Sequence, residues 1–542
     1  MITKQGHTIR KLLGTIASTL AIAVGVAEAR LAPDKPTFAA DVVYHDMNGN
    51  QSFDAGERRV SGIRVSNGRE IVRTDGEGRY RLPIGEDTIL FVIKPRGWRT
   101  PVSEDQLPQF YYIHKPNGSP ALRYAGVAPT GPLPDSVDFP LYPQTEPDTF
   151  KAILFADPQP TDQRDVDYVA HDVVEELIGT DASFGMTLGD IMNSDLSLFG
   201  SQNRTIALLG IPWYNVIGNH DLNYDAKNDQ HSDETFERVF GPSCYSFDYG
   251  TVHFLVVDDV EWYFPHEGGE GTYRGGLGER QFEFIRNDLA MIPEEQLVVV
   301  LMHIQVNRVW DGDRQKLFRL IEQRPFCMSI SGHAHRHEHL FIAQDDGWRG
   351  PEPHHHVVNV TVSGCWWKGG PDERGIPHAQ MTDGTPNGYS IINFDGHEYT
   401  LDYKAAGRPA DYQVAIHAPE VVSAAKAGET DVFVNVFNGS ERSRVELQFG
   451  EHDAWTAMER SVRVDPGYKA LYDAEMSIKE KFWKELPEPG DSIHLWRAKL
   501  PSNPKPGTHL LTVRTTDMHG RTYVGRRIIR VSGPDGIEPK PE

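Results

Sequence analysis

The pattern of apolar and polar positions changes character twice along the chain and predicts three folded regions. From about Ala39 to Tyr142, short β-rich runs alternate with turn dipeptides such as Asn48-Gly49, Asn67-Gly68 and Asp75-Gly76. Short runs bounded by such turns are typical of antiparallel strands. This region therefore predicts a β-sandwich of the immunoglobulin-like or prealbumin-like kind.

The second region, from about Thr149 to Lys404, combines strands with helices. The segment from Asp165 to Ile178 has apolar residues at helical spacing, and Gln281 to Met291 is a second helix candidate. Strands that alternate with helices predict an α/β layered domain. The expected strands are Ala152–Ala156, Phe184–Leu188, Trp213–Ile217, His253–Val257, Leu297–Met302 and Met328–Ser331.

The third region begins near Pro409 and reads as β structure again, with a longer segment around Tyr472 to Leu486 that is either a loop or a helix. Its strand candidates are Val432–Phe437, Arg444–Phe449, His509–Thr515 and Arg526–Val531. The whole chain is thus expected to be multidomain, α/β plus all-β, with a central α/β sandwich between an N-terminal β-sandwich and a C-terminal β-rich domain. The expected segments are a signal peptide at 1–29, domains at 30–147, 148–405 and 406–532, and a disordered tail at 533–542.

The first residues have the features of a secretory signal. Lys4, Arg10 and Lys11 precede an apolar stretch from Leu12 to Val26, and Ala27-Glu28-Ala29 fits a small-x-small cleavage pattern. The apolar stretch is shorter than the ~20 residues of a spanning helix, and no later segment is long and apolar enough to span. An uncleaved membrane anchor is the alternative. The mature protein is expected in the periplasm or outside the cell, with no transmembrane segment.

Charge and cysteine content narrow the classes of partner. The net charge is -23 over 542 residues. Binding to nucleic-acid phosphates requires a basic surface, so no nucleic-acid partner is expected. The three cysteines do not show the paired spacing of a thiolate zinc site, and their odd number leaves at least one free thiol. The oligomeric state is not predicted.

Metal-capable residues follow the strands of the central region directly. Carboxyl ends of strands gather at one edge of an α/β sheet, which places these residues around a common crevice. A glycine before several of them lets the backbone pass close to a bound ion. Carboxylates, imidazoles and an amide oxygen form a mixed nitrogen and oxygen site that suits Zn, Mn or Fe. The strand-end motifs are Asp157-Pro158-Gln159, Gly189-Asp190, Gly218-Asn219-His220-Asp221, His303 and Gly332-His333-Ala334-His335.

In this order, the motifs resemble those of the calcineurin-like metallophosphoesterase superfamily, from Asp157 to His335. The flanking regions resemble, more loosely, the accessory domains of a bacterial subfamily. The resemblance implies that Asp190 bridges two metal ions. It implies that Asp157 and His335 bind the first ion and that Asn219, His303 and His333 bind the second.

One position departs from the family pattern. Many members have Asp-x-His in the first motif, where this chain has Gln159. An amide oxygen is a weaker ligand than imidazole for borderline metals. The first ion is therefore expected to bind more weakly, or to be a harder ion such as Mn²⁺ or Mg²⁺. The remaining alternative is that Gln159 does not bind a metal at all.

The resemblance also implies a function and a mechanism. Two divalent ions roughly 3.5–4 Å apart would neutralise phosphate charge and make a bridging hydroxide available for in-line attack on phosphorus. His220 would stabilise or protonate the leaving oxygen, and Asp221 is expected to orient His220 through its other ring nitrogen. The chain is therefore expected to be an exported phosphoesterase of phosphate mono- or diesters. A small-molecule or headgroup phosphate ester is the expected partner.

Two alternatives stay open. The first is a non-catalytic envelope binding protein that keeps the fold without full activity, a reading motivated by Gln159 and the two β-rich flanks. The second is a transport or scaffold module for envelope polymers. Metal content together with turnover of a generic aryl phosphate separates the enzyme from both.

Four further features are interpreted from the sequence. Trp366, Trp367 and Lys368 are candidates for substrate contact, and Asp259 to Gly278 is expected to be a long loop beside the pocket. His354, His355 and His356 are expected in a surface loop. The fourth feature resembles a structural calcium loop, with a polar β-turn as the alternative. Its residues are Asp46, Asn48, Asn50, Asp54 and Glu57.

Overall fold

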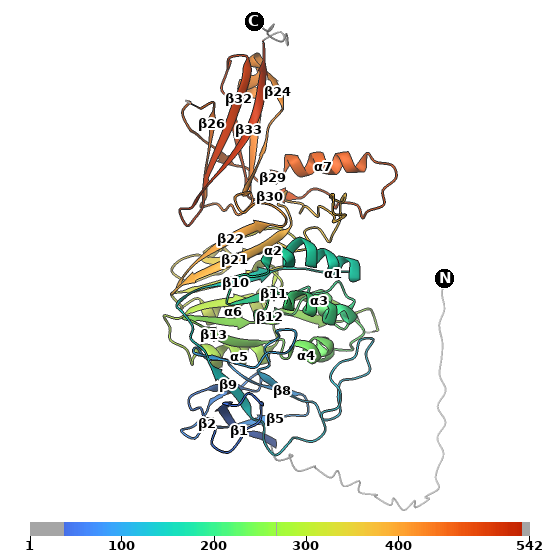
Figure 1. Cartoon of the computed structure of the whole chain (residues 1–542), viewed down its shortest axis with the longest axis vertical. Helices are drawn as coiled ribbons and strands as arrows, with labels where there is room; N and C mark the ends of the chain where they lie inside the picture. Colours follow the sequence, from blue (N-terminus) through green and yellow to red (C-terminus); the bar gives the residue numbers. More distant parts are fainter. Residues whose placement is uncertain (1–36, 267, 452, 534–542) are drawn as a thin grey trace, which may run out of the picture.

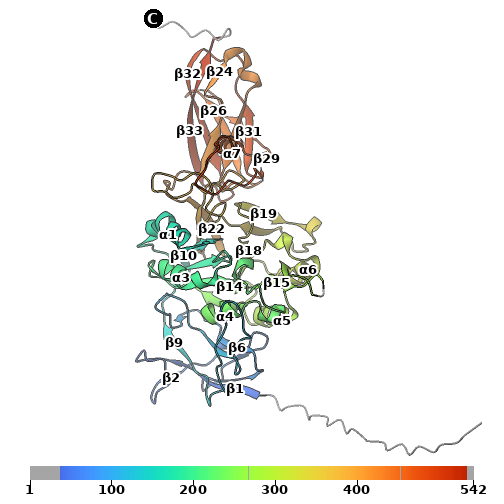
Figure 2. The same cartoon turned by 90° about the vertical axis from the view of Figure 1, so that its right-hand side faces the viewer.

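The computed structural model describes residues 37–266, 268–451 and 453–533, which form three regions along the long axis of the molecule (Figure 1). The predicted signal peptide at 1–29 and the predicted tail beyond residue 533 lie outside the described residues. Figure 2 places β1 and β6 at one end and β24 and β32 at the other. In the described part of the chain, no helix is long and apolar enough to cross a membrane.

The N-terminal region consists of two small sheets, as the alternating pattern predicts. Tyr80 and Phe139 from one sheet, and Val65 and Phe91 from the other, belong to the same buried cluster. In the first sheet β1 (Thr37–His45) pairs with β2 (Arg58–Arg59), β5 (Arg79–Ile84) and β9 (Phe139–Pro143), and β9 pairs with β7 (Trp98–Arg99). The second has the order β4 (Ile71–Arg73), β3 (Arg64–Ser66), β6 (Thr88–Val92) and β8 (Tyr111–His114).

The central region contains two larger sheets, and the expected strands are all present. The first sheet has the order β12 (Trp213–Val216), β11 (Phe184–Leu188), β10 (Thr149–Phe155), β21 (Gly388–Asp395) and β22 (Glu398–Ala405). The second has the order β13 (Tyr245–Tyr249), β14 (Val252–Val256), β17 (Leu297–Leu301), β18 (Cys327–Ser331), β20 (His354–Val358) and β19 (Glu338–Ile342). The pairs β10–β11, β11–β12, β14–β17 and β17–β18 are parallel.

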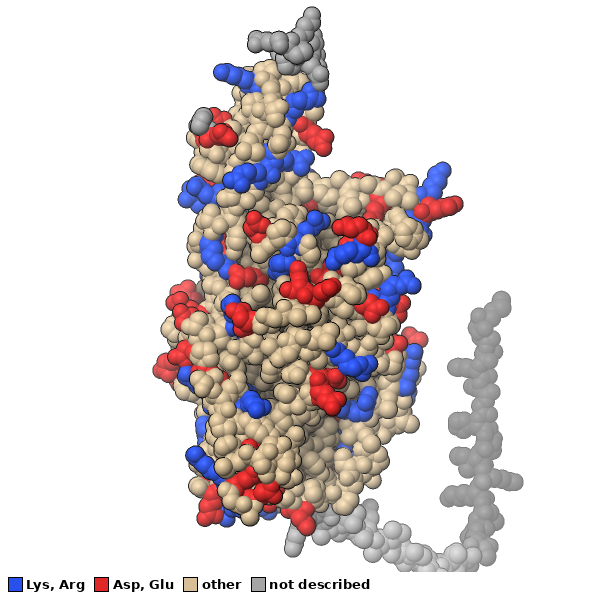
Figure 3. Space-filling view, viewed as in Figure 1, with Lys and Arg blue, Asp and Glu red and all other residues tan. Residues whose placement is uncertain are grey.

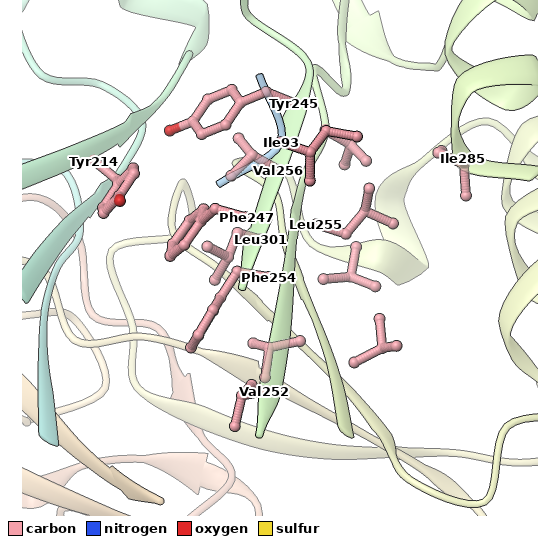
Figure 4. Close-up of a cluster of buried hydrophobic side chains, with 14 of the residues drawn as sticks. Ile93, Tyr214, Tyr245, Phe247, Val252, Phe254, Leu255, Val256, Ile285 and Leu301 are labelled. Carbon is pink, nitrogen blue, oxygen red and sulfur yellow. The ribbon is translucent and has the colours of Figure 1, made fainter. Parts of the chain in front are cut away.

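Aromatic side chains join the two central sheets face to face. Tyr214 of β12 stacks on Phe247 of β13, with ring centroids 3.9 Å apart, and Phe184 of β11 meets Phe254 of β14 at 5.3 Å. Figure 4 shows Tyr214 facing Phe247 across the gap between the sheets, while Leu255 points away toward Ile285. Aromatic pairs at such distances add about 0.5–1.5 kcal/mol beyond the burial of their area.

Helices cover the outer faces of both sheets, which gives the region four layers. The π-helical turn Ala170–Val174 links α1 (Gln163–Val169) to α2 (Glu175–Leu177), and it interrupts the continuous helix expected from Asp165 to Ile178. These elements and α3 (Phe199–Ala207) bury apolar residues against β10. The helices α5 (Glu279–Leu289) and α6 (Asp311–Ile321) cover the second sheet, and α4 (Glu234–Phe240) lies toward the N-terminal region.

The C-terminal region packs two sheets around a core of its own. One sheet has the order β23 (Val414–His417), β25 (Asp431–Val436), β31 (Leu495–Lys499) and β28 (Glu459–Arg460). The other has the order β24 (Val421–Ser423), β33 (Thr522–Ser532), β32 (Gly507–Thr516), β26 (Arg444–Phe449) and β27 (Thr456–Ala457). The paired strands β29 (Arg463–Val464) and β30 (Asp491–Ser492) flank α7 (Pro466–Met476) in the chain. The first residues of the segment Tyr472–Leu486, for which loop and helix were both open, are therefore helical.

Two sequence expectations are wrong at the level of elements. The segment from Asp259 to Gly278 is not one long loop, because β15 (Val260–Tyr263) pairs with β16 (Thr272–Gly275) as a hairpin that buries Trp262. His354, His355 and His356 do not lie in a surface loop. They form buried strand β20, where Ser329 and Tyr399 bond to their rings. Those hydrogen bonds compensate for burying imidazoles.

Candidate metal centre

The carboxyl ends of five strands from the two central sheets meet at one place. Each strand is buried, and each is followed within three residues by a polar side chain. The strands and the side chains after them are β10 with Asp157, β11 with Asp190, β12 with Asn219, β17 with His303 and β18 with His333. The arrangement is the one that the strand-end argument predicts for an α/β sheet edge.

The backbone at these strand ends is strained. The φ angles are +44° at Asp157, +49° at Asp190, +70° at His333 and +50° at His335. Side chains other than glycine reach this left-handed region only at a cost of about 1–2 kcal/mol per residue. Strain of this kind is found where a chain must present a side chain in one direction.

The glycines beside the candidate ligands are required by close approach. A Cβ on Gly218 would lie 2.0 Å from the backbone nitrogen of Asp190, and one on Gly332 would lie 2.4 Å from Asp157 Oδ2. A Cβ on Gly189 would lie 2.3 Å from His303 Nδ1. No other residue type fits these positions without moving a candidate ligand.

One group of candidate ligands surrounds His303. The ligand atoms of Asp190, His303 and His333 all lie within 4.8 Å of one another. His303 Nε2 lies 3.0 Å from Asn219 Oδ1 and 3.2 Å from His333 Nδ1. His303 Nδ1 lies 2.8 Å from the carbonyl of Leu188, so this bond directs Nε2 toward the cluster.

A second group consists of Asp157, Gln159 and His335. His335 Nε2 lies 3.6 Å from Asp157 Oδ1, and His335 Nδ1 lies 2.5 Å from the carbonyl oxygen of Gly364. Gln159 Nε2 donates to Asp190 Oδ2 at 2.7 Å. Its other terminal atom, Oε1, is buried with no hydrogen-bond partner. A buried amide oxygen without a partner is costly unless something absent from the protein itself satisfies it.

The electrostatics keep two of the imidazoles neutral. Burial, and next the charge of His303, lower the pKa of His333 to about 3. Burial lowers the pKa of His335 to about 4, although its bond to Gly364 opposes this. Burial also opposes the charge on His303, but Asp190 outweighs it and raises that pKa to about 10. Neutral imidazole is the form that binds a metal.

The donor set fits a pair of divalent cations. Two carboxylates, three imidazoles and two amide side chains converge from both sheets, and Gln159 Oε1 among them has no hydrogen-bond partner. Mixed nitrogen and oxygen donors of this kind suit Zn, Mn, Fe or Mg. The bridging place falls to Asp190, because its carboxylate contacts Gln159 of the second group and His303 of the first.

The two ends of the chain match family models. The model described as the N terminal of calcineurin-like phosphoesterase matches residues 46–124, and the model described as the C terminal of calcineurin-like phosphoesterase matches residues 355–523. These two matches identify segments of this chain as the N- and C-terminal domains of calcineurin-like phosphoesterases. The candidate ligands lie between the two matched segments, and the second match begins inside β20.

Other comparisons add little. No curated protein matches the chain. Among solved structures, purple acid phosphatase PPD1 from seeds of yellow lupin (Lupinus luteus) is similar over 64% of this chain and 67% of its own. Sequence identity is 14% and the TM-score is 0.36, so this likeness carries no conclusion about site or substrate.

His220 lies beside the same centre, where its backbone nitrogen donates to Asp190 Oδ1, but the partner of its ring is not the one expected. Ser194 Oγ lies 2.8 Å from His220 Nδ1. Asp221 does not orient His220, because its carboxylate accepts from the backbone nitrogens of Ile191, Met192 and Gly218. No motif surrounds Ser194, so this contact could not be predicted from the sequence, although Ser194 closely follows Asp190.

The segment from Cys365 to Gly369 borders the candidate metal centre in part. The ring of Trp366 lies 4.1 Å from the ring of His335, and the Lys368 ammonium lies 4.9 Å from the Trp366 ring. Trp367 does not face a substrate, because it is 1% exposed and its Nε1 donates to the carbonyl of Pro158 at 3.0 Å. Trp367 therefore packs under the Asp157–Gln159 turn instead of bordering the pocket.

The residues of the predicted calcium loop bond to one another. Asp54 Oδ2 accepts from Asn48 Nδ2 at 2.9 Å and from Asn50 Nδ2 at 2.8 Å. Glu57 accepts from Met47 N, and Asp46 accepts from the hydroxyl of Tyr142. The loop is thus closed by its own polar groups, and calcium binding stays a prediction.

A second cluster of possible metal ligands is occupied by the ammonium group of a lysine. Asp87, His231 and Glu234 have ligand atoms within 4.8 Å of one another. However, Lys115 Nζ lies 3.0 Å from Asp87 Oδ1 and 2.5 Å from Glu234 Oε2. The ammonium takes the place of a cation there and joins the N-terminal region to α4.

Proposed function

We propose that this protein hydrolyses phosphate mono- or diesters with the aid of two divalent metal ions. The observation that carries the proposal is the convergence of Asp190, His303 and His333, with Asp157 and His335 beside them, in a chain with these calcineurin-like phosphoesterase domains. When bound, the two ions would neutralise phosphate charge and supply hydroxide near neutral pH.

The chain's own residues prepare the centre for that chemistry. The backbone nitrogen of His220 donates to Asp190 Oδ1 at 2.8 Å, and the backbone nitrogen of His333 donates to Asp157 Oδ2 at 2.9 Å. The carbonyls of Leu188 and Gly364 fix the ring orientation of His303 and His335. Preorganised ligands of this kind bind without a further ordering cost.

His220 is placed to act on the leaving group. It follows the candidate ligand Asn219 in a 3₁₀ turn, and its ring is half-buried beside the exposed Tyr224. With Nδ1 bonded to Ser194, Nε2 is the nitrogen available to substrate. A proton held at Nε2 would stabilise or protonate the departing oxygen of the ester.

The test compares wild type with His220→Ala on a panel of phosphate esters after metal reconstitution. The variant is expected to keep its metal and to lose turnover by about 10²–10⁴-fold, the usual contribution of a general acid. A variant that turns over as fast as wild type would remove the role assigned to His220.

The competing proposal is a non-catalytic binding protein of the envelope. The departure that favours it is Gln159, which bonds to Asp190 where many family members have histidine. That protein would bind phosphate esters and hydrolyse none, so the same panel separates the two. A module for envelope polymers would bind glycan or headgroup without turnover.

Partner and location are also proposed. A small-molecule or headgroup phosphate ester fits the acidic chain better than a nucleic acid, since positive and negative side chains are interspersed on the face in Figure 3. Export is inferred from the pattern of Lys4, Leu12–Val26 and Ala27-Glu28-Ala29. Cell fractionation with N-terminal sequencing tests it, and a chain in the cytoplasm that keeps Met1 would contradict it.

A further inference from the structure

A loop of the central region and a segment of the C-terminal region, far apart in the sequence, connect the C-terminal region to the metal centre. We call Gly364–Gly370 the substrate loop and residues 465–490, which lie between β29 and β30 and contain α7, the arm. Figure 1 shows α7 leaving the base of the C-terminal region on the side where α1 lies. Lys484 of the arm lies 3.3 Å from Asp165 of α1.

The first end of the substrate loop contacts a candidate metal ligand. The carbonyl of Gly364 accepts from His335 Nδ1, and Thr361 Oγ1 donates to the same carbonyl at 2.8 Å. Gly364 has a φ of +51°, and a Cβ there would lie 1.7 Å from the carbonyl oxygen of Ala379. The loop therefore starts from a position fixed on both sides.

The second end of the substrate loop is held by the arm. Glu475 Oε1 accepts from the backbone nitrogen of Gly370 at 2.8 Å and lies 2.9 Å from His378 Nε2. Glu475 Oε2 accepts from Trp483 Nε1 at 3.2 Å. The backbone nitrogen of Gly369 donates to the carbonyl of Lys484 at 2.9 Å. Glu475 is only 6% exposed, so these bonds are little weakened by competing water.

The middle of the loop is strained and needs this support. Trp366 and Trp367 are consecutive and have φ angles of +63° and +52°. Strained residues persist only where the surroundings hold them. The strain turns Trp366 against His335 and Trp367 into the core, and it brings Lys368 over the Trp366 ring.

We propose that the arm of the C-terminal domain sets substrate preference at the metal centre, with Glu475 as the positioning residue and Trp366 and Lys368 as the groups that meet the ester's non-transferred part. The inference rests on the proposed function, because it assumes that the substrate is a phosphate ester. An ester with a flat or apolar group beside the phosphate is preferred, because Trp366 offers an aromatic surface next to a metal ligand and Lys368 adds a positive charge.

The first experiment measures the connection without any substrate. Hydrogen exchange of the metal-loaded protein is compared among wild type, Glu475→Ala, Glu475→Gln and Asp473→Asn. Asp473 is the matched control, because it lies on the same helix and pairs only with exposed Lys469. Exchange at Gly369 and Gly370 is expected to quicken about tenfold in Glu475→Ala, less in Glu475→Gln, and not in Asp473→Asn.

The second experiment measures binding of phenylphosphonate and of inorganic phosphate. Trp366→Ala and Glu475→Ala are expected to weaken phenylphosphonate about tenfold while changing inorganic phosphate less than about twofold. For p-nitrophenyl phosphate, KM is expected to rise and kcat to stay, since the loop contributes binding and not the attacking group. Metal content, measured in parallel, is expected to be unchanged.

The results separate this inference from the proposed function. Phenylphosphonate binding that depends on Trp366 and Glu475, without turnover of any ester, would contradict the proposed hydrolase function and support the inference. Wild-type exchange rates in Glu475→Ala, or equal loss of both ligands in Trp366→Ala, overturn the inference whether or not esters are hydrolysed.

Discussion

Ser194, and not Asp221, contacts the ring of His220, the candidate general acid. Its hydroxyl bonds to His220 Nδ1, and its φ of +69° places it in the left-handed region. Glycine and asparagine tolerate that backbone, so they can replace serine there without adding strain. This gives a pair of variants that remove or keep a hydrogen-bonding side chain.

Ser194→Gly is expected to lower kcat about tenfold for alkyl phosphates and much less for p-nitrophenyl phosphate. The reason is that an alkoxide needs the proton from His220, whereas nitrophenolate leaves without it. Ser194→Asn should recover part of the loss. Steady-state kinetics on both esters check this, and an equal loss on both would show that Ser194 only supports the fold.

Substitutions of Gln159, the residue that departs from the family pattern, test whether this position binds the metal. Gln159→His is expected to tighten Zn²⁺ binding about tenfold, because imidazole is the better ligand and histidine tolerates the φ of +44°. Gln159→Ala should weaken it. Chelator competition measures both, and identical affinities in all three proteins would mean that position 159 does not bind the metal.

At the scale of elements, the strand ends were predictable and their surroundings were not. Apolar runs followed by glycine and a polar residue carry a local signal, so Asp190 and His333 could be placed from the sequence. Ser194 and Glu475 act through partners that no periodic pattern marks. His355 was predicted in a surface loop because a run of polar residues is typical of loops. Its burial in a strand depends on the hydrogen bond to Tyr399, which is distant in the sequence.

The close approach at the strand-end glycines leads to a further prediction. Gly218→Ala is expected to lower metal content and turnover by at least about tenfold, since its Cβ would lie 2.0 Å from Asp190 N. Gly200→Ala in α3 is the control, because its Cβ would meet only the end of Arg204 at 3.2 Å. Full metal content in Gly218→Ala would show that the strand ends are looser than described.

At the scale of the molecule, a buried ionic network joins the N-terminal and central regions. Arg64 of β3 lies 2.6 Å from Asp248 and 2.8 Å from Asp288, and His253 contacts both carboxylates. Burial opposes charge on His253, but Asp288 outweighs it and raises the pKa of His253 above 6.5. Breaking a buried network of this kind leaves uncompensated charge and is strongly destabilising.

The network predicts how stability depends on pH. A raised pKa means that the contribution of His253 is complete below pH 6.5 and is lost as pH rises through the folded value. The free energy of unfolding of wild type should therefore fall in that range relative to His253→Gln. Urea titrations measure it, with exposed His171→Gln as control. Parallel pH curves for wild type and His253→Gln would contradict the assignment.

The proposed two-metal centre depends on Asp190 joining both groups of ligands. The most direct measurement is metal content and phosphate-ester turnover of wild type and Asp190→Asn, with circular dichroism to show that both are folded. We expect about two divalent ions per wild-type chain and loss of both metal and turnover in the variant. A folded Asp190→Asn with wild-type metal content and turnover would contradict it.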